Sequence, residues 1–151
     1  MPHHGHGVAA PPDADPEDGE EYLYTNFEPY ESHRLFPQFD QPDIKASYAL
    51  TVTAPSHWEL VANSRETGRA EAGGGRSTWT FETTKPFSTY LFALVAGPYQ
   101  AFRDQHGEIP LGLYCRKSMA KYLDTAELFE ITKQGLDFYA DFFDFPYPFG
   151  K

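Results

Sequence analysis

The sequence lacks the features of a disulfide-bonded or membrane-spanning protein. Cys115 is the one cysteine in 151 residues, so no disulfide can form within the chain, and a reducing compartment is the simpler expectation. No apolar run approaches the roughly 20 residues that a membrane-spanning helix requires. The first ten residues also lack the apolar centre of a secretory signal peptide. These absences predict a cytoplasmic protein with no membrane span.

Positive charge is also scarce. The chain has 12 Lys and Arg against 22 Asp and Glu, and its net charge of −10 argues against binding to nucleic acid or to anionic membrane surfaces. Neither Lys nor Arg occurs before Arg34, whereas acidic residues cluster near the start. Residues 1–19 contain too few apolar side chains to offset their ordering entropy, so we predict a disordered acidic, histidine-containing tail without a metal site.

Short catalytic motifs are missing as well. His33, His57 and His106 do not show the H-E-x-x-H spacing or any other spacing typical of zinc ligands. The glycines at 73–75 are not followed by the Lys-Ser/Thr of a phosphate-binding loop, and no serine lies in a nucleophile elbow. A small buried hydrophobic residue is the better interpretation of Cys115 than a nucleophile. We therefore expect no catalytic residue and no metal ligand in this chain.

What the sequence does contain is a series of short strand patterns. Hydrophobic residues make up 40% of the chain and aromatic residues 17%, which is compatible with a packed core. Residues 44–54 alternate between an apolar and a polar face, Trp79 and Phe81 alternate inward within 78–83, and residues 89–96 are apolar on both faces, as in a central strand. Further strands are expected at 58–62, 99–103 and 111–115. This spacing predicts a mainly β, antiparallel sandwich-like domain.

A helical period replaces the strand pattern after Asp124. Apolar residues recur at steps of three and four, at Leu128, Ile131, Gly135, Phe138 and Phe142. Asp124, with Glu127 three residues later, predicts an N-cap, and Pro146 is expected to end the helix. We interpret the stripe as a core-packing face and not as a cofactor site.

One polar pair at the end of a predicted strand is a candidate binding site. In the run YLYTNFEP at 22–29, Asn26 and Glu28 share a face with Tyr22 and Tyr24, because strand side chains alternate. Pro29 disfavours helix at Glu28 and holds it extended where the strand stops. On spacing alone, an edge-strand glutamate in water is the commoner interpretation.

Several runs together resemble the zinc aminopeptidase N family, and the likeness covers nearly everything from residue 20 to 151. They occur in family order, at 22–29 (YLYTNFEP), 34–37 (RLFP), 39–45 (FDQPDIK), 58–63 (WELVAN), 84–90 (TKPFSTY), 96–99 (AGPY) and 142–150. The family fold is a saddle-shaped β domain packed against a thermolysin-like zinc domain. The resemblance therefore implies a partial N-terminal β domain at 20–113 and the start of the catalytic domain at 114–151.

The same resemblance implies roles for the polar pair. Glu28 matches the glutamate that binds the free α-amino group of the substrate, and Asn26 matches a position, most often Gln, that lines the pocket for the first side chain. The departure at Asn26 puts the side-chain preference in doubt. The G-A-M-E-N and H-E-x-x-H motifs of the family do not occur in these 151 residues, so zinc is expected in a full-length family member and not in this chain.

The sequence thus predicts a piece of a zinc-dependent aminopeptidase that removes N-terminal residues from peptides, and that is inactive by itself. Its expected partners are peptides with a free N-terminus and the remainder of a catalytic domain. The alternatives are a non-catalytic binding or scaffold module of the same family and a free-standing β-sandwich interaction protein. Because the terminal helix would lack its main packing partner, we predict that Phe138, Phe142 and their neighbours form an exposed apolar patch.

Overall fold

The computed structural model describes residues 13–27 and 31–151. Glu28 and the tail histidines His3, His4 and His6 lie outside the described residues. The chain divides into two compact units, Met1–Tyr99 and Gln100–Lys151. The domain limits 1–19, 20–113 and 114–151 stay a prediction. Within the stretch predicted to be a disordered tail, Asp13 and Ala14 pair with the strand that follows.

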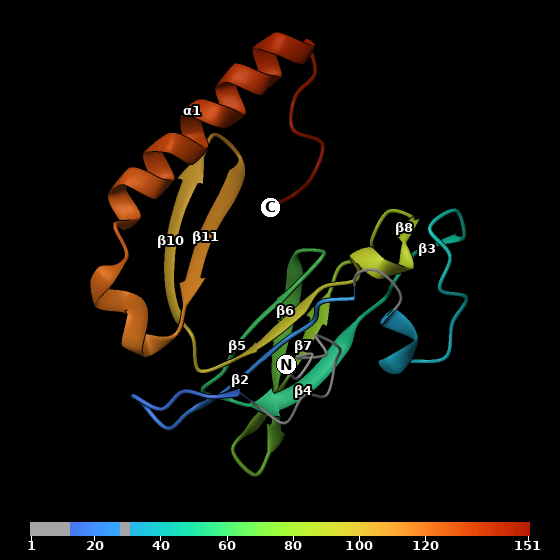
Figure 1. The fold of residues 1–151 in the computed structure, drawn as a ribbon, viewed down its shortest axis with the longest axis vertical. Helices are drawn as coiled ribbons and strands as arrows, with labels where there is room; N and C mark the ends of the chain where they lie inside the picture. The colour runs from blue at the N-terminus through green and yellow to red at the C-terminus, as the bar shows by residue number, and fades with distance from the viewer. Residues whose placement is uncertain (1–12, 28–30) are drawn as a thin grey trace, which may run out of the picture. The chain divides into compact units, whose positions relative to one another are not determined.

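A four-stranded antiparallel sheet lies at the centre of the first unit (Figure 1). Its order is β1 (Asp13–Ala14), β2 (Glu21–Tyr24), β9 (Leu94–Gly97) and β5 (Glu59–Ala62). Ala96 of β9 is opposite Leu23 of β2 on one side and Leu60 of β5 on the other. β9 therefore pairs on both sides. It comes last of these four strands in the sequence, and its two partners come from distant parts of the chain.

A second, three-stranded sheet has the order β4 (Thr51–Pro55), β7 (Arg76–Phe81) and β6 (Glu66–Gly73). The turn between β6 and β7 lies at the three predicted glycines, Gly73, Gly74 and Gly75, whose φ angles are 77°, 59° and 71°. Residues other than glycine rarely adopt positive φ angles of this size, which explains why three glycines occur in this turn. Threonines face each other across β4 and β7, with Thr51 opposite Thr80 and Thr53 opposite Thr78.

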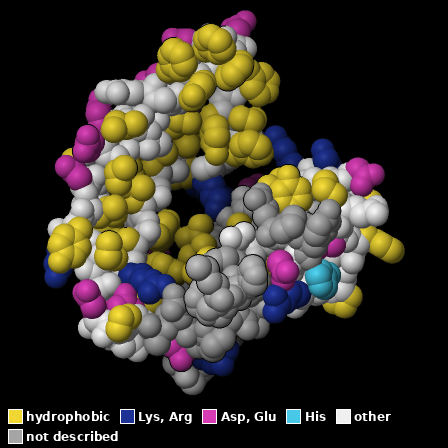
Figure 2. Space-filling model, viewed as in Figure 1, with side chains coloured by type: hydrophobic (Ala, Val, Ile, Leu, Met, Phe, Trp, Pro, Cys, Tyr) yellow, Lys and Arg dark blue, Asp and Glu magenta, His cyan; other side chains and the backbone are white. Residues whose placement is uncertain are grey.

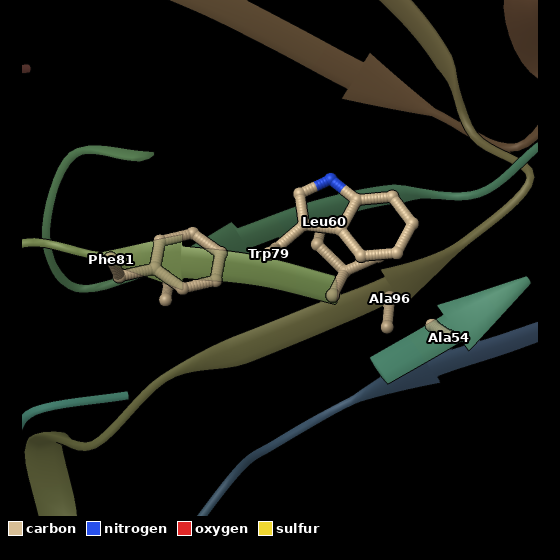
Figure 3. Close-up of a cluster of buried hydrophobic side chains, with 6 residues drawn as sticks. Ala54, Leu60, Trp79, Phe81 and Ala96 are labelled. Atoms are coloured by element: carbon tan, nitrogen blue, oxygen red, sulfur yellow. The ribbon is translucent and has the colours of Figure 1, made fainter. Parts of the chain in front are cut away.

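The core forms where side chains of the two sheets meet (Figure 3). The predicted inward residues Trp79 and Phe81 of β7 are 1% and 5% exposed. They pack with residues from three other strands, namely Ala54, Leu60, Ala62 and Ala96. This confirms the mainly β, antiparallel sandwich predicted from the alternation.

Two predicted strands are interrupted. The stretch 44–54 forms β3 (Lys45–Ala46) and β4, and these pair with different partners, β8 (Phe87–Ser88) and β7. The stretch 89–96 begins as a short 3₁₀ helix, η2 (Thr89–Leu91), and only its second half joins β9. In both stretches the apolar pattern continues past the point where strand pairing changes or stops, because hydrogen bonding to a neighbouring strand decides where a strand ends.

The second unit is a hairpin with a helix. β10 (Gln100–His106) and β11 (Ile109–Cys115) are longer than predicted, because Gln105 pairs with Pro110 inside the ladder. Both strands of a two-stranded ribbon are edges, so the missing N–H of a proline is tolerated there. A 3₁₀ segment, η3 (Lys117–Tyr122), leads to the helix α1 (Thr125–Phe143).

α1 is capped as predicted at its start, where the Asp124 carboxylate accepts a hydrogen bond from the Glu127 N–H at 3.1 Å. It ends before Pro146, at Asp144, whose φ of 48° is left-handed. Two side-chain contacts join α1 to β10: Lys133 Nζ forms an ion pair with Asp104 Oδ2 at 2.7 Å, and His106 Nε2 lies 2.6 Å from Asp137 Oδ1.

Much of the apolar stripe of α1 is exposed. Phe138 is 60% and Phe142 69% exposed, as predicted, whereas Phe129 is buried. Hydrophobic side chains gather along this unit in Figure 2. Further exposed aromatic residues at and beyond the end of the helix are Tyr139, Phe143, Phe145, Tyr147 and Phe149. Leu128 and Ile131 in the first half of the stripe are exposed as well, so the interpretation of the stripe as a packed face is wrong for both of its halves in this chain.

Candidate functional site

The predicted alternation of the candidate segment holds only to the end of β2. Tyr22 and Phe27 are each 1% exposed, whereas Leu23, Tyr24 and Asn26 between them are exposed. Asn26 lies beyond the strand, which ends at Tyr24, so the prediction that Asn26 belongs to a strand face with Tyr22 and Tyr24 is wrong.

Thr25 causes the change of direction by replacing the strand ladder with side-chain hydrogen bonds. Its N–H donates to the Leu94 carbonyl at 3.0 Å. Its hydroxyl accepts from the Leu94 N–H at 2.9 Å and donates to the Phe92 carbonyl at 3.3 Å. Thr25 is thus hydrogen-bonded to Phe92 and Leu94, at the start of β9, and the strand β2 does not continue beyond it.

Phe27 then anchors the segment in an aromatic cluster. Its ring centroid lies 6.3 Å from that of Phe92, which also contacts Phe36 at 5.5 Å and Tyr48 at 5.2 Å. A buried phenylalanine of this kind contributes several kcal/mol to stability, about 3–5 on truncation to alanine. Asn26 is left exposed between two anchored neighbours.

The chain is held again immediately after residues 28–30. The Glu31 N–H donates to the Phe27 carbonyl at 2.9 Å, and Ser32 is fully buried. The Glu31 carboxylate forms an ion pair with Arg34, three residues later, at 2.6 Å from its Nη1. Glu28 is outside the described residues, so its role stays a prediction; Phe27 before the undescribed residues and Glu31 after them are held by the contacts given above.

Asp40, predicted to be structural, joins the loop after this segment to η2. Its carboxylate lies 3.4 Å from His33 Nδ1 and accepts from the Thr89 hydroxyl at 3.4 Å. Burial raises the pKa of Asp40, but interactions with the neighbouring Ser32 and His33 outweigh burial and hold the pKa below its usual value. Asp40 therefore serves to keep the loop in place as a carboxylate.

The described residues offer no constellation for metal binding. No three His, Cys, Asp or Glu side chains among residues 13–27 and 31–151 lie close enough together to hold an ion. His33 and His106 each contact one aspartate, in different units. Cys115 is half-buried, and burial raises the pKa of its thiol, which disfavours the reactive thiolate.

No helix in the described part of the chain is long and apolar enough to cross a membrane.

Comparison with known proteins identifies the family. Residues 13–91 match the family model described as the peptidase M1 N-terminal domain. The chain is 41% identical over 141 residues to aminopeptidase N of Streptomyces lividans, covering 91% of this chain and 16% of that protein. It is 32% identical over 126 residues to aminopeptidase N of Acetobacter pasteurianus, covering 83% and 35%. It is also 31% identical to endoplasmic reticulum aminopeptidase 2 of Bos taurus, over 84% of this chain and 13% of that one.

Residues 13–91 include β1 to β8 and the aromatic anchors Phe27 and Phe36, so the matched region covers most of the sandwich next to Asn26, whereas Phe92 and β9 follow it. The chain spans only a minor part of the length of each of these relatives. The family match covers more than half of the chain, and the chain therefore belongs to the M1 family of aminopeptidases, in the region of their N-terminal domain.

Proposed function

We propose that this chain is the substrate-anchoring part of a zinc-dependent aminopeptidase that removes N-terminal amino acids from peptides. Glu28 binds the free α-ammonium of the peptide, and Asn26 lines the pocket for its first side chain. The observation that carries the proposal is the exposure of Asn26 between Thr25 and Phe27, both of which are held rigidly by the sandwich. Its membership of the M1 family supports the same role.

This role has a clear physical basis. An aminopeptidase has to recognise an ammonium group and cut one residue away from it, so the anchor must be both charged and fixed in position. A carboxylate binds an ammonium through charge-assisted hydrogen bonds, which are about twice as strong as neutral ones. Phe27, which directly precedes the proposed anchor in the sequence, is buried in the aromatic cluster and ties the backbone before it to the sandwich.

Zinc would supply the activated water and the polarisation of the scissile carbonyl in such an enzyme. The donor set among the described residues does not fit a zinc ion, so the proposal assigns this chain the anchor and not the metal site. A cytoplasmic location belongs to the same proposal and rests on the single cysteine.

The test is a chimera in which this chain replaces the matching segment of the Streptomyces lividans aminopeptidase N. Glu28→Ala should lower kcat/KM on an aminoacyl anilide by about 30-fold to several thousand-fold, since loss of one partner of a close charge pair costs about 2–5 kcal/mol. Glu31→Ala is the matched control, because Glu31 is three residues away and is paired with Arg34. It should leave kcat/KM within a factor of about two.

Asn26→Gln tests the pocket. If Asn26 lines the site of the first side chain, the longer amide should change the ranking of small and large N-terminal residues while leaving the requirement for a free amine. An unchanged kcat/KM in Glu28→Ala would remove the anchor role, and the non-catalytic module of the same family would then be the better description.

A further inference from the structure

Two side chains hold the backbone that enters β9, one from each neighbouring strand. β9 lies between β2 and β5 in the sheet. Thr25 is the first residue after β2, and Asn63 is the first residue after β5. Both side chains reach the same stretch of backbone, residues 91–94, which comes between η2 and β9 and has no sheet partner before Leu94.

Asn63 satisfies this backbone from the β5 side. Its Oδ1 accepts a hydrogen bond from the Ala93 N–H at 2.6 Å, and its Nδ2 donates to the Leu91 carbonyl at 2.8 Å. An amide suits this position because it carries an acceptor and a donor side by side. Leucine would leave both backbone groups unpaired, and aspartate would satisfy only the N–H.

Thr25 satisfies the same backbone from the β2 side, through the Leu94 N–H and the Phe92 carbonyl. The residue held between the two side chains is Phe92, which is 6% exposed and whose ring packs on Phe27. The position of the Phe92 ring therefore depends on both side chains. The position of Phe27 depends in turn on Phe92, and Asn26 precedes Phe27 directly.

We propose that Thr25 and Asn63 are positioning residues for the substrate-binding segment, and that they fix the direction in which Asn26 faces. This inference rests on the proposed function of that segment. Thr25 acts on the segment as part of it, whereas Asn63 acts through residues 91–93 and the Phe92–Phe27 contact.

The first measurement uses the 151-residue chain and needs no substrate. Thr25→Val keeps the shape of the side chain and removes its hydroxyl, so amide hydrogen exchange at Leu94 should become faster by about tenfold, as expected for one lost hydrogen bond. Asn63→Leu should likewise make amide hydrogen exchange at Ala93 faster by about tenfold, because it removes the acceptor of the Ala93 N–H. Thr25→Ser keeps the hydroxyl and should restore slow exchange at Leu94.

Thr78→Val is the matched control, since it also removes a threonine hydroxyl in a strand hydrogen bond, to Thr53 at 2.8 Å in the other sheet. It should leave exchange at Ala93 and Leu94 unchanged. Unchanged exchange in Thr25→Val and Asn63→Leu would overturn the inference at this first step.

The second measurement uses the chimera with the Streptomyces protein and two inhibitors that differ only in the first side chain, leucine hydroxamate and alanine hydroxamate. If Thr25 and Asn63 position Asn26 at the pocket for this side chain, Thr25→Val and Asn63→Leu should change the ratio of the two affinities by about tenfold. Thr25→Ser should restore the ratio. A general loss of structure would weaken both inhibitors equally.

Comparison with Asn26→Gln separates the two proposals. A changed affinity ratio in Asn26→Gln, with an unchanged ratio in Thr25→Val and Asn63→Leu, would overturn the positioning role and leave the proposed function intact. An unchanged ratio in Asn26→Gln would overturn both the pocket role and the positioning role.

Discussion

Substitution by alanine should change the free energy of unfolding strongly at one phenylalanine of α1 and hardly at all at another. Phe129 is 9% exposed and Phe142 is 69% exposed, and both belong to α1. Truncation of a buried phenylalanine to alanine removes its burial and leaves a cavity, at a cost of about 3–5 kcal/mol. Truncation of a largely exposed one should change the free energy of unfolding by no more than about 0.5 kcal/mol.

The exposed ring has a further measurable consequence. A phenylalanine side chain buries about 150–250 Å² when covered, so a ring as exposed as Phe142 leaves roughly two thirds of this area in water. At about 25 cal/mol per Å², covering it would be worth approximately 3 kcal/mol. Phe142→Ala, and more strongly Phe138→Ser with Phe142→Ser, should therefore lower the binding of a fluorescent hydrophobic dye and reduce self-association.

Both effects can be measured on the 151-residue chain. Urea unfolding followed by the helical circular dichroism signal gives the free energy of unfolding, and dye fluorescence with size-exclusion chromatography gives the exposed apolar surface. Phe129→Ala is the control for helix loss. If Phe142→Ala destabilised the chain as much as Phe129→Ala, or left dye binding unchanged, the assignment of an uncovered aromatic face would be refuted.

Two further predictions concern the first unit. Gly97→Ala should destabilise the chain by about 1–3 kcal/mol in urea unfolding, because an added Cβ would lie 3.1 Å from both the Glu21 carbonyl oxygen and the Tyr99 ring; equal stability would show that the strand shifts freely. Asp40→Asn tests the lowered pKa of Asp40. Because the folded pKa lies below the unfolded value of about 3.9, the carboxylate stabilises the fold above that pH, and this contribution is lost as the pH falls through the folded value. The difference in unfolding free energy between wild type and Asp40→Asn should therefore shrink on acidification from pH about 5 to about 3, and a difference that does not depend on pH would contradict a role for the charge.

The sequence predicts the parts of the fold that depend on local alternation. Trp79, Phe81 and Ala54 are inward as their period requires, and the turn at residues 73–75 follows from three glycines with positive φ. Strand ends are different, since they depend on whether a partner is present. Residues 44–54 and 89–96 keep an apolar pattern across breaks where the ladder changes partner or stops.

For the candidate site, the resemblance supplied Asn26 and Glu28, and spacing alone favoured an ordinary edge glutamate. Thr25 and Asn63 were missed because their hydrogen-bond partners are far away in sequence, 69 residues for Thr25 with Leu94 and 30 residues for Asn63 with Ala93. No local pattern distinguishes such a threonine or asparagine from one in solvent. For Asn63, the signal that could have indicated it is its position directly after the strand predicted at 58–62. Thr25 gave no such signal, because it lies within the strand predicted from Tyr22 to Glu28.

The outer strand of the three-stranded sheet has a consequence for solubility. β6 is exposed along its whole length, and its outer backbone faces no other strand among those described. The unpaired backbone groups of such an edge can form hydrogen bonds with a strand of another molecule. The register against β7 shifts between Glu66 and Gly68 and again between Glu71 and Gly73, and the strand carries Glu66, Arg69 and Glu71. Irregular twist and charges of both signs disfavour intermolecular pairing, so aggregation of the chain should begin at the aromatic face of α1 and not at this edge.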